Sequence, residues 1–157
     1  MKELRGLELS RRSEGPKGKN REVVGDIGKL DAEQKKRDIQ DPLTYAIIGA
    51  AIKVHGALGP GFTEDTYHKA LMVELAEQEI EFVCQPYYDV VYQGVRCGKY
   101  QPDLVAENRV VIELKAISDL AGDHFAQTIS YLRASGLPVG LLINFGQKSL
   151  TWRRFCH

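Results

Sequence analysis

The sequence has few cysteines and no excess of charge of one sign. Its 157 residues include three cysteines, Cys84, Cys97 and Cys156, an odd number without Cys-x-x-Cys spacing. This pattern argues against a disulfide framework and a zinc finger, and it favours a reducing, cytoplasmic location. The 21 basic and 21 acidic side chains cancel. The balance excludes a histone-like protein, which would hold nucleic acid through a large basic excess.

Long apolar segments are also missing. No run approaches the roughly 18 residues that a membrane-spanning helix requires. Residues 1–20 are charged throughout, unlike a signal peptide. We therefore expect no membrane association. The hydrophobic fraction of 43% is still sufficient for a core, and the chain length suits one domain.

Charge is distributed unevenly along the chain. Residues 1–40 carry 11 Lys and Arg against 8 Asp and Glu, a net of +3, whereas residues 41–157 carry 10 against 13, a net of −3. The first segment shows little apolar periodicity, so it buries too little surface to offset chain entropy. We interpret residues 1–40 as a flexible basic extension, a solvated tail rather than an arm that contacts nucleic acid. Residues 41–157 are expected to form the folded domain.

The folded part is predicted to begin at Asp41-Pro42, a helix N-cap followed by proline at the first helical position. Apolar residues at helical spacing predict a first helix as far as Gly56. Further helices are predicted from about Thr63 to Gln78 and from about His124 to Ala134. Strands are predicted over residues 82–85, 88–92, 95–106, 110–114, 139–145 and 150–155. This order indicates an α/β (α+β) fold around one mixed sheet.

Two acidic residues and a lysine stand out in the strand region. Glu113 and Lys115 are two positions apart, so their side chains project from one face of a strand. The turn at Glu107-Asn108 folds the preceding strand back and brings Asp103 opposite Glu113, within one residue of register. Two adjacent carboxylates repel each other, and a hard divalent cation such as Mg²⁺ relieves that repulsion. A Glu-x-Lys pattern by itself more often marks a strand face that is simply exposed to solvent.

The helices supply further candidates. Glu64 begins the inward stripe of the second predicted helix, where a carboxylate requires a metal or a hydrogen-bonding partner. The alternative is that Glu64 only complements the positive N-terminus of that helix. His124, Gln127 and Tyr131 recur at helical spacing and form a polar stripe on the third predicted helix. For His124 we favour a solvated helix face.

These residues belong to a wider pattern. Residues 61–67 read Gly-x-x-Glu-x-x-Tyr. Around them stand Ala46–Ala51, Val54-His55, Pro102-Asp103, Glu113–Ala116, Gln127 with Tyr131-Leu132, and Gly140–Gly146. Over about residues 43–155 the combination resembles the GxxExxY protein family, a branch of the PD-(D/E)XK nuclease-like superfamily. The sequence departs from that family at Gly56, where a basic residue is expected after the histidine.

The resemblance implies a restriction-endonuclease-like core, in which a mixed central β-sheet is flanked by helices and carries an acidic cluster at its edge. Asp103 and Glu113 match the metal-binding acids, and Lys115 matches the catalytic lysine. Glu64 matches an additional acid, carried on a helix, that joins the catalytic metal site. The resemblance therefore implies a nuclease that depends on Mg²⁺, with Mn²⁺ able to substitute, and that acts on DNA or RNA.

Gln127 and Tyr131 match a Gln-x-x-x-Tyr element, to which we assign substrate positioning. The alternative function is a non-catalytic subunit on the same fold that binds nucleic acid or another protein. The net charge of −3 over residues 41–157 argues against tight unaided binding to DNA. Either a homodimer or a protein partner is compatible with the sequence.

Overall fold

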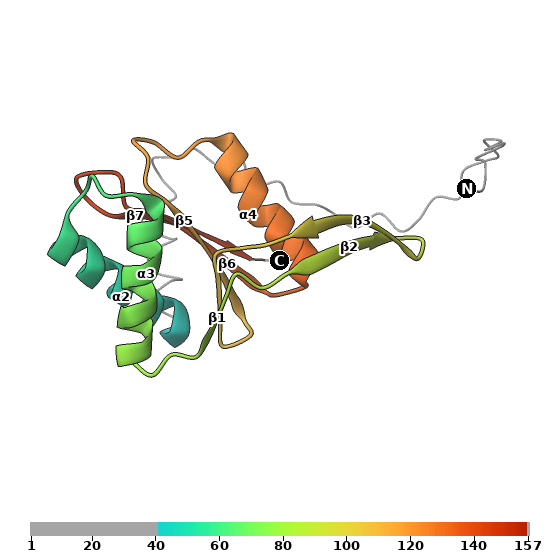
Figure 1. Ribbon diagram of the computed structural model, residues 1–157, viewed down its shortest axis with the longest axis horizontal. Helices are drawn as coiled ribbons and strands as arrows, with labels where there is room; N and C mark the ends of the chain where they lie inside the picture. The colour runs from blue at the N-terminus through green and yellow to red at the C-terminus, as the bar shows by residue number, and fades with distance from the viewer. Residues whose placement is uncertain (1–40, 157) are drawn as a thin grey trace.

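The order of helices and strands follows the sequence prediction closely. The computed structural model describes residues 41–156, and the predicted extension, residues 1–40, lies outside the described residues (Figure 1). The elements are α2 (Pro42–Leu58), α3 (Glu64–Glu77), β1 (Phe82–Cys84), β2 (Tyr88–Tyr92), β3 (Val95–Tyr100), β4 (Leu104–Ala106), β5 (Val110–Lys115), α4 (Gly122–Ser135), β6 (Val139–Asn144) and β7 (Thr151–Cys156).

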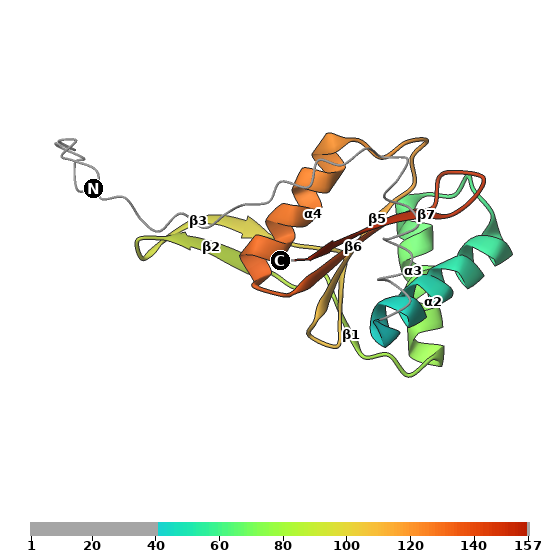
Figure 2. The same ribbon diagram turned by 180° about the vertical axis from the view of Figure 1, so that it is seen from behind.

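A five-stranded sheet with the order β1-β4-β5-β6-β7 forms the centre of the fold. β5 and β6 run parallel, and the other neighbouring pairs are antiparallel. A parallel pair needs a crossover, and α4 supplies it. Helices α2 and α3 lie together on one side of the sheet, away from α4 (Figures 1 and 2). The predicted mixed sheet flanked by helices is confirmed, and the architecture agrees with a restriction-endonuclease-like fold.

The prediction of a single sheet is wrong for β2 and β3. The sequence predicts one strand over residues 95–106, but the structure divides it into β3 and β4, with residues 101–103 between them. β2 and β3 pair as a separate two-stranded sheet and project from the body (Figure 1). Pro102 provides the physical reason, because proline has no backbone N–H to continue a strand ladder.

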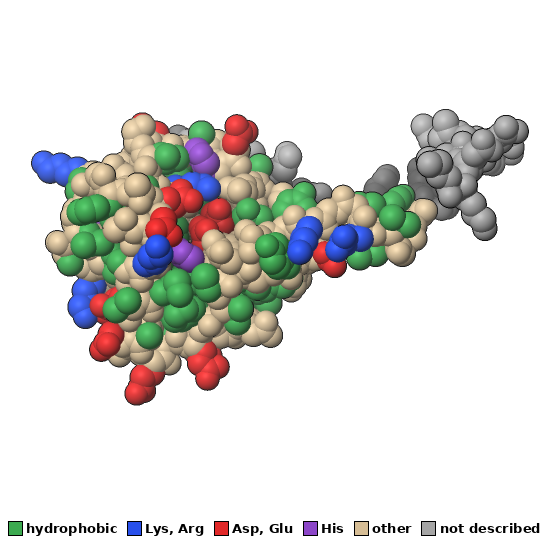
Figure 3. All heavy atoms as spheres, in the orientation of Figure 1, with side chains coloured by type: hydrophobic (Ala, Val, Ile, Leu, Met, Phe, Trp, Pro, Cys, Tyr) green, Lys and Arg blue, Asp and Glu red, His purple; other side chains and the backbone are tan. Residues whose placement is uncertain are grey.

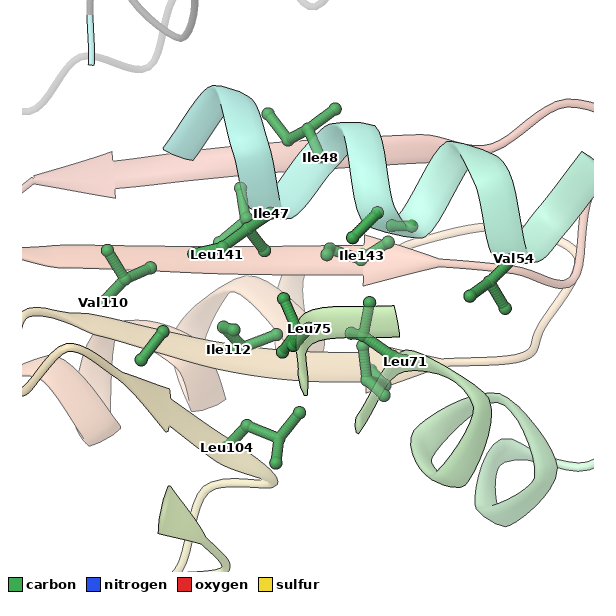
Figure 4. Packing of buried hydrophobic residues seen from close by; sticks show 14 of the residues in the cluster. Ile47, Ile48, Val54, Leu71, Leu75, Leu104, Val110, Ile112, Leu141 and Ile143 are labelled. Carbon is green, nitrogen blue, oxygen red and sulfur yellow. The ribbon is translucent and has the colours of Figure 1, made fainter. Parts of the chain in front are cut away.

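Alternate residues of the central strands pack against opposite layers. One face of β4, β5 and β6 meets α2 and α3 in the main core (Figure 4). Its fully buried members include Ile47, Leu71, Leu75, Leu104, Ile112, Leu141 and Ile143. On the opposite face Val111 packs with Tyr131 and Leu132 of α4. Since side chains alternate along a strand, Glu113 and Lys115 share the face that α4 covers.

Helix α2 is fixed at its beginning by Asp41. The Asp41 carboxylate accepts a hydrogen bond from the Thr44 hydroxyl at 2.6 Å and forms ion pairs with Arg109 and with Arg154, the latter at 3.6 Å. Burial raises the pKa of Asp41, but the hydrogen bonds from Thr44 and Arg109 and the two guanidinium charges hold it below the ordinary value. The predicted N-cap therefore also joins α2 to the β4–β5 turn and to β7.

The end of α2 lies two residues beyond the predicted one. A glycine inside a helix costs only about 1 kcal/mol, so Gly56 does not stop α2. The helix ends instead at Gly59, whose positive φ of 71° suits glycine and whose N–H donates to the carbonyl of His55 at 2.8 Å. No helix in the described part of the chain has the length and apolar character needed to cross a lipid bilayer.

Candidate active site

The carboxylates of Asp103 and Glu113 are held by hydrogen bonds that extend the β4–β5 ladder. Leu104 pairs with Ile112, so Asp103 lies opposite Glu113, and the predicted register is confirmed. The backbone N–H of Asp103 donates to Glu113 Oε2 at 3.4 Å, and Asp103 Oδ2 accepts from the backbone N–H of Leu114 at 2.7 Å. The backbone beside each strand thus donates a hydrogen bond that holds the carboxylate from the neighbouring strand in place.

Lys115 completes this group on the same strand face. Its Nζ lies 3.3 Å from Glu113 Oε1, and the two side chains are 14% and 5% exposed. This contact restricts the rotamers that the Lys115 side chain can adopt. The structure therefore brings together the three residues that the strand pattern singles out.

Electrostatics at Glu113 favour its neutral form. Burial, and then the nearby negative charge of Asp103, raise the pKa of Glu113 to about 7, although Lys115 and the Asp103 N–H offset part of the rise. The two carboxylates repel each other strongly because water is partly excluded around them. A hard divalent cation relieves that repulsion, since such cations prefer oxygen ligands. One or two carboxylates are sufficient to hold Mg²⁺, which retains several of its waters.

The Gly-x-x-Glu-x-x-Tyr segment forms the loop between α2 and α3 and the first turn of α3. The buried Tyr67 hydroxyl donates to the carbonyl of Gly59 at 2.5 Å and accepts from the N–H of Phe62 at 3.2 Å. The Tyr67 ring stacks on Phe145 with centroids 4.6 Å apart. Tyr67 therefore anchors the loop to the core and fixes where α3 begins, which is at Glu64.

Glu64 lies within electrostatic range of the carboxylate pair. Burial raises the pKa of Glu64, with a smaller rise from Asp103, while Lys115, His68 and His124 lower it. Acidic side chains gather on this face of the molecule with histidines beside them (Figure 3). Within residues 41–156, however, no three His, Cys, Asp or Glu side chains come together as a group able to hold a metal ion. Glu64 is thus coupled to Asp103 and Lys115 through its charge without forming such a group with them.

Gln127 and Tyr131 both face the sheet from α4. Gln127 Nε2 donates to the Tyr131 hydroxyl at 3.0 Å. Tyr131 is buried, and burial followed by the charge of Glu113 raises its pKa. His124 is partly exposed at the beginning of α4, and its Nδ1 accepts from the Ala121 N–H at 2.9 Å. That hydrogen bond satisfies a backbone donor at the beginning of α4.

Two further side chains support the site without having been predicted. The buried His68 on α3 donates through Nε2 to the carbonyl of Asp103 at 3.2 Å, and Gln85 N–H donates to the same oxygen at 2.9 Å. The fully buried Asn144 hydrogen-bonds Ile117, in the loop that follows Lys115. The available sequence signal was weak: a polar residue closing an otherwise apolar strand at Asn144, and a histidine beside Tyr67.

The model of a family described as the PD-(D/E)XK nuclease superfamily matches residues 41–155. No curated protein and no solved structure matches the chain. The matched span runs from the N-cap of α2 into β7 and includes every candidate residue described above.

Proposed function

This chain belongs to the PD-(D/E)XK nuclease superfamily, and on that premise we propose that it hydrolyses phosphodiester bonds of DNA or RNA with the help of Mg²⁺. The observation that carries the proposal is the pairing of the half-buried Asp103 with the buried Glu113, with Lys115 Nζ at 3.3 Å from Glu113 Oε1. Three charged groups that are partly withdrawn from water on one sheet face are costly unless they serve a ligand.

The proposed ligands of the cation are Asp103 and Glu113, and Mn²⁺ is expected to substitute. Bound there, a divalent cation supplies Lewis-acid polarisation of the phosphate and a more acidic water. Lys115 is proposed to stabilise the negative charge that develops on the phosphate, since its ammonium is already fixed beside Glu113. The backbone bonds from Leu114 and Asp103 hold both carboxylates in place, so that little reorganisation is needed when substrate arrives.

The remaining candidates are assigned supporting roles. Glu64 is proposed to contribute a third carboxylate at the rim, carried there by the loop that Tyr67 anchors. Gln127 and Tyr131 are proposed to position the substrate from α4. The contacts of Tyr67 with Gly59 and Phe62 hold the loop directly before Glu64, and this arrangement supports the finer proposal that the chain is of the GxxExxY type.

The test is metal-dependent cleavage of labelled single-stranded and duplex DNA and RNA. Wild-type protein should cleave at least one substrate with Mg²⁺ or Mn²⁺, and Asp103→Asn and Glu113→Gln should each lose about a hundredfold or more. Glu77→Gln is the matched control, because Glu77 is an exposed carboxylate at the far end of α3. Activity that survives in both site variants indicates a contaminating nuclease.

A non-catalytic subunit is the competing function. It is favoured by the net charge of −3 over residues 41–157, which disfavours unaided binding of a nucleic-acid substrate. It predicts binding without cleavage on every substrate and with either cation. It also predicts that Asp103→Asn leaves nucleic-acid affinity unchanged or improved, because a negative charge is lost.

A further inference from the structure

The projecting β2–β3 ribbon exposes several large apolar side chains to solvent, and this exposure does not stabilise the ribbon itself. We use the name hairpin arm for residues 87–100. Tyr92 near its tip is 67% exposed, and Tyr87, Val91 and Val95 are comparably open. A two-stranded hairpin alone is marginally stable in water. Exposed aromatic and β-branched residues on such an element therefore indicate a surface that serves a partner.

One face of the hairpin arm carries its cations. Asp89 pairs with Lys99 and Val91 pairs with Arg96 across the ribbon, so these four side chains share a face. Lys99 Nζ lies 3.5 Å above the ring centroid of Tyr87, and Arg96 is 3.9 Å from Asp89. Since Asp89 offsets only one of the two cations, the face keeps a net positive charge beside an open aromatic ring.

The base of the arm is fastened directly to the candidate active site. Gln101 Nε2 donates to the carbonyl of Gln85 at 2.9 Å, which joins the two legs of the ribbon. The N–H of Gln85 in turn donates to the carbonyl of Asp103 at 2.9 Å. Tyr100, the last residue of β3, packs edge-on against Tyr131 with centroids 6.0 Å apart. The arm thus has a fixed direction relative to the carboxylate pair.

Exposed charges are distributed unevenly over the molecule, and their distribution favours the approach of a polyanion along the arm. Exposed acidic residues crowd the end of α3 and the loops below it, at Glu77, Glu79, Glu81 and Glu107. The Lys and Arg side chains of the arm lie on the same face of the molecule as the central acidic group, away from that acidic end (Figure 3). A groove between the arm and α4 adds the exposed Arg133. A polyanion that reaches the site is therefore guided along the arm rather than across α3.

We propose that the hairpin arm binds the nucleic-acid strand beside the scissile phosphate, with Arg96 and Lys99 on phosphates and Tyr87, on the same face as these cations, stacked on a base. This inference rests on the proposed function and names the part of the chain that holds its substrate. The six residues of β3 span about 20 Å at about 3.3 Å per residue. That length matches about six base-pair steps of a duplex, in which each strand contributes one phosphate per about 3.4 Å of helix axis.

The first experiment measures binding of the full chain to labelled DNA and RNA oligonucleotides by fluorescence anisotropy, in EDTA so that cleavage cannot contribute. Arg96→Ala with Lys99→Ala should weaken affinity about tenfold at low salt and reduce the slope of log K against log salt by about 1.5. Tyr87→Ala should weaken binding at least about fivefold, mostly to single strands. Single-stranded and duplex probes, each made of DNA and of RNA, distinguish which kind of nucleic acid the arm binds.

Matched controls remove the same groups elsewhere. Lys53→Ala with Lys148→Ala deletes two exposed cations away from the arm, and Tyr45→Ala deletes a tyrosine that is 60% exposed on α2. These variants should keep the wild-type affinity and salt slope. Equal binding by the arm variants and the wild type, or no binding by the wild type at all, overturns the proposal.

Two readouts separate this proposal from the proposed function. Cleavage of bis(p-nitrophenyl) phosphate, which is too short to reach the arm, should be unchanged in the arm variants while cleavage of long substrates falls. A wild type that cleaves nothing but binds nucleic acid through the arm refutes the nuclease and upholds the arm. An arm that holds a second copy of this chain would give a dimer that the arm variants dissociate while nucleic-acid affinity stays constant, and that result overturns the proposal.

Discussion

Asn144 and Ile117 exchange two hydrogen bonds across the end of the sheet. Asn144 Oδ1 accepts from the Ile117 N–H at 3.0 Å, and Asn144 Nδ2 donates to the Ile117 carbonyl at 2.8 Å. Asn144 Oδ1 also accepts from the N–H of Gly146 at 3.0 Å. One fully buried side chain thus replaces the strand ladder just beyond Lys115, and it fixes the loop that leads to α4.

Asn144→Ala should destabilise the protein by about 2–3 kcal/mol, because it leaves the backbone groups of Ile117 without their partner. Urea denaturation measures the loss, and Ser149→Ala in the exposed loop before β7 is the control. Cleavage should fall together with stability, since the same bonds hold the chain beside Lys115. A variant that unfolds at the wild-type urea concentration would contradict this account.

The sequence predicted the layers of the fold and the Asp103–Glu113 register because both follow from local rules. Side chains alternate along a strand, and the turn at Glu107-Asn108 sets which residues oppose one another. The separate hairpin arm was missed because pairing partners are a tertiary property, and only Pro102 hinted at the break. Asn144 was missed because its partners lie 27 residues away in the chain.

Tyr67→Phe should lower the free energy of unfolding by about 1–2 kcal/mol while it preserves the stacking on Phe145. The lost hydroxyl bonds to Gly59 and Phe62 free the loop that begins α3. Because that loop carries Glu64, cleavage should fall more than the small loss of stability explains. The comparison is kcat at a temperature where both proteins remain folded, with Tyr45→Phe on the surface of α2 as control. Equal kcat would remove Tyr67 from any positioning role.

Glu113→Gln should stabilise the metal-free protein at pH 8, because it replaces a buried carboxylate that faces Asp103 with a neutral group. The pKa of Glu113 is raised from 4.5 to about 7 in the folded state. The folded wild type therefore holds its proton more tightly, and its stability falls as pH rises from about 4.5 to about 7. The loss over that range is about 3 kcal/mol.

The stabilisation by Glu113→Gln should consequently be large at pH 8 and small at pH 5. Urea denaturation at the two pH values in EDTA tests this, with Glu77→Gln expected to change little at either. A difference between variant and wild type that does not depend on pH would show that Glu113 titrates normally. Stabilisation combined with lost cleavage would mark Glu113 as a residue kept for function at the expense of stability.

Lys115→Ala should abolish cleavage while Mn²⁺ still raises the melting temperature. The lysine is proposed to act on charge that develops in the transition state, whereas the cation is held by Asp103 and Glu113, and an ion that binds only the folded state stabilises it by mass action. Asp103→Asn is the contrasting variant, and it should lose both the cleavage and the Mn²⁺-dependent shift.

The contact between Lys115 and Glu113 adds a dependence on pH to this result. The Lys115 ammonium lowers the pKa of Glu113, so its removal leaves Glu113 protonated to a higher pH. Because a protonated carboxyl binds a cation poorly, the Mn²⁺-dependent shift of Lys115→Ala should be weak at pH 6 and should approach the wild-type shift near pH 9. Melting curves across that range, with and without Mn²⁺, measure it. A shift lost at every pH would make Lys115 necessary for building the cation site, and would withdraw the purely catalytic role proposed for it.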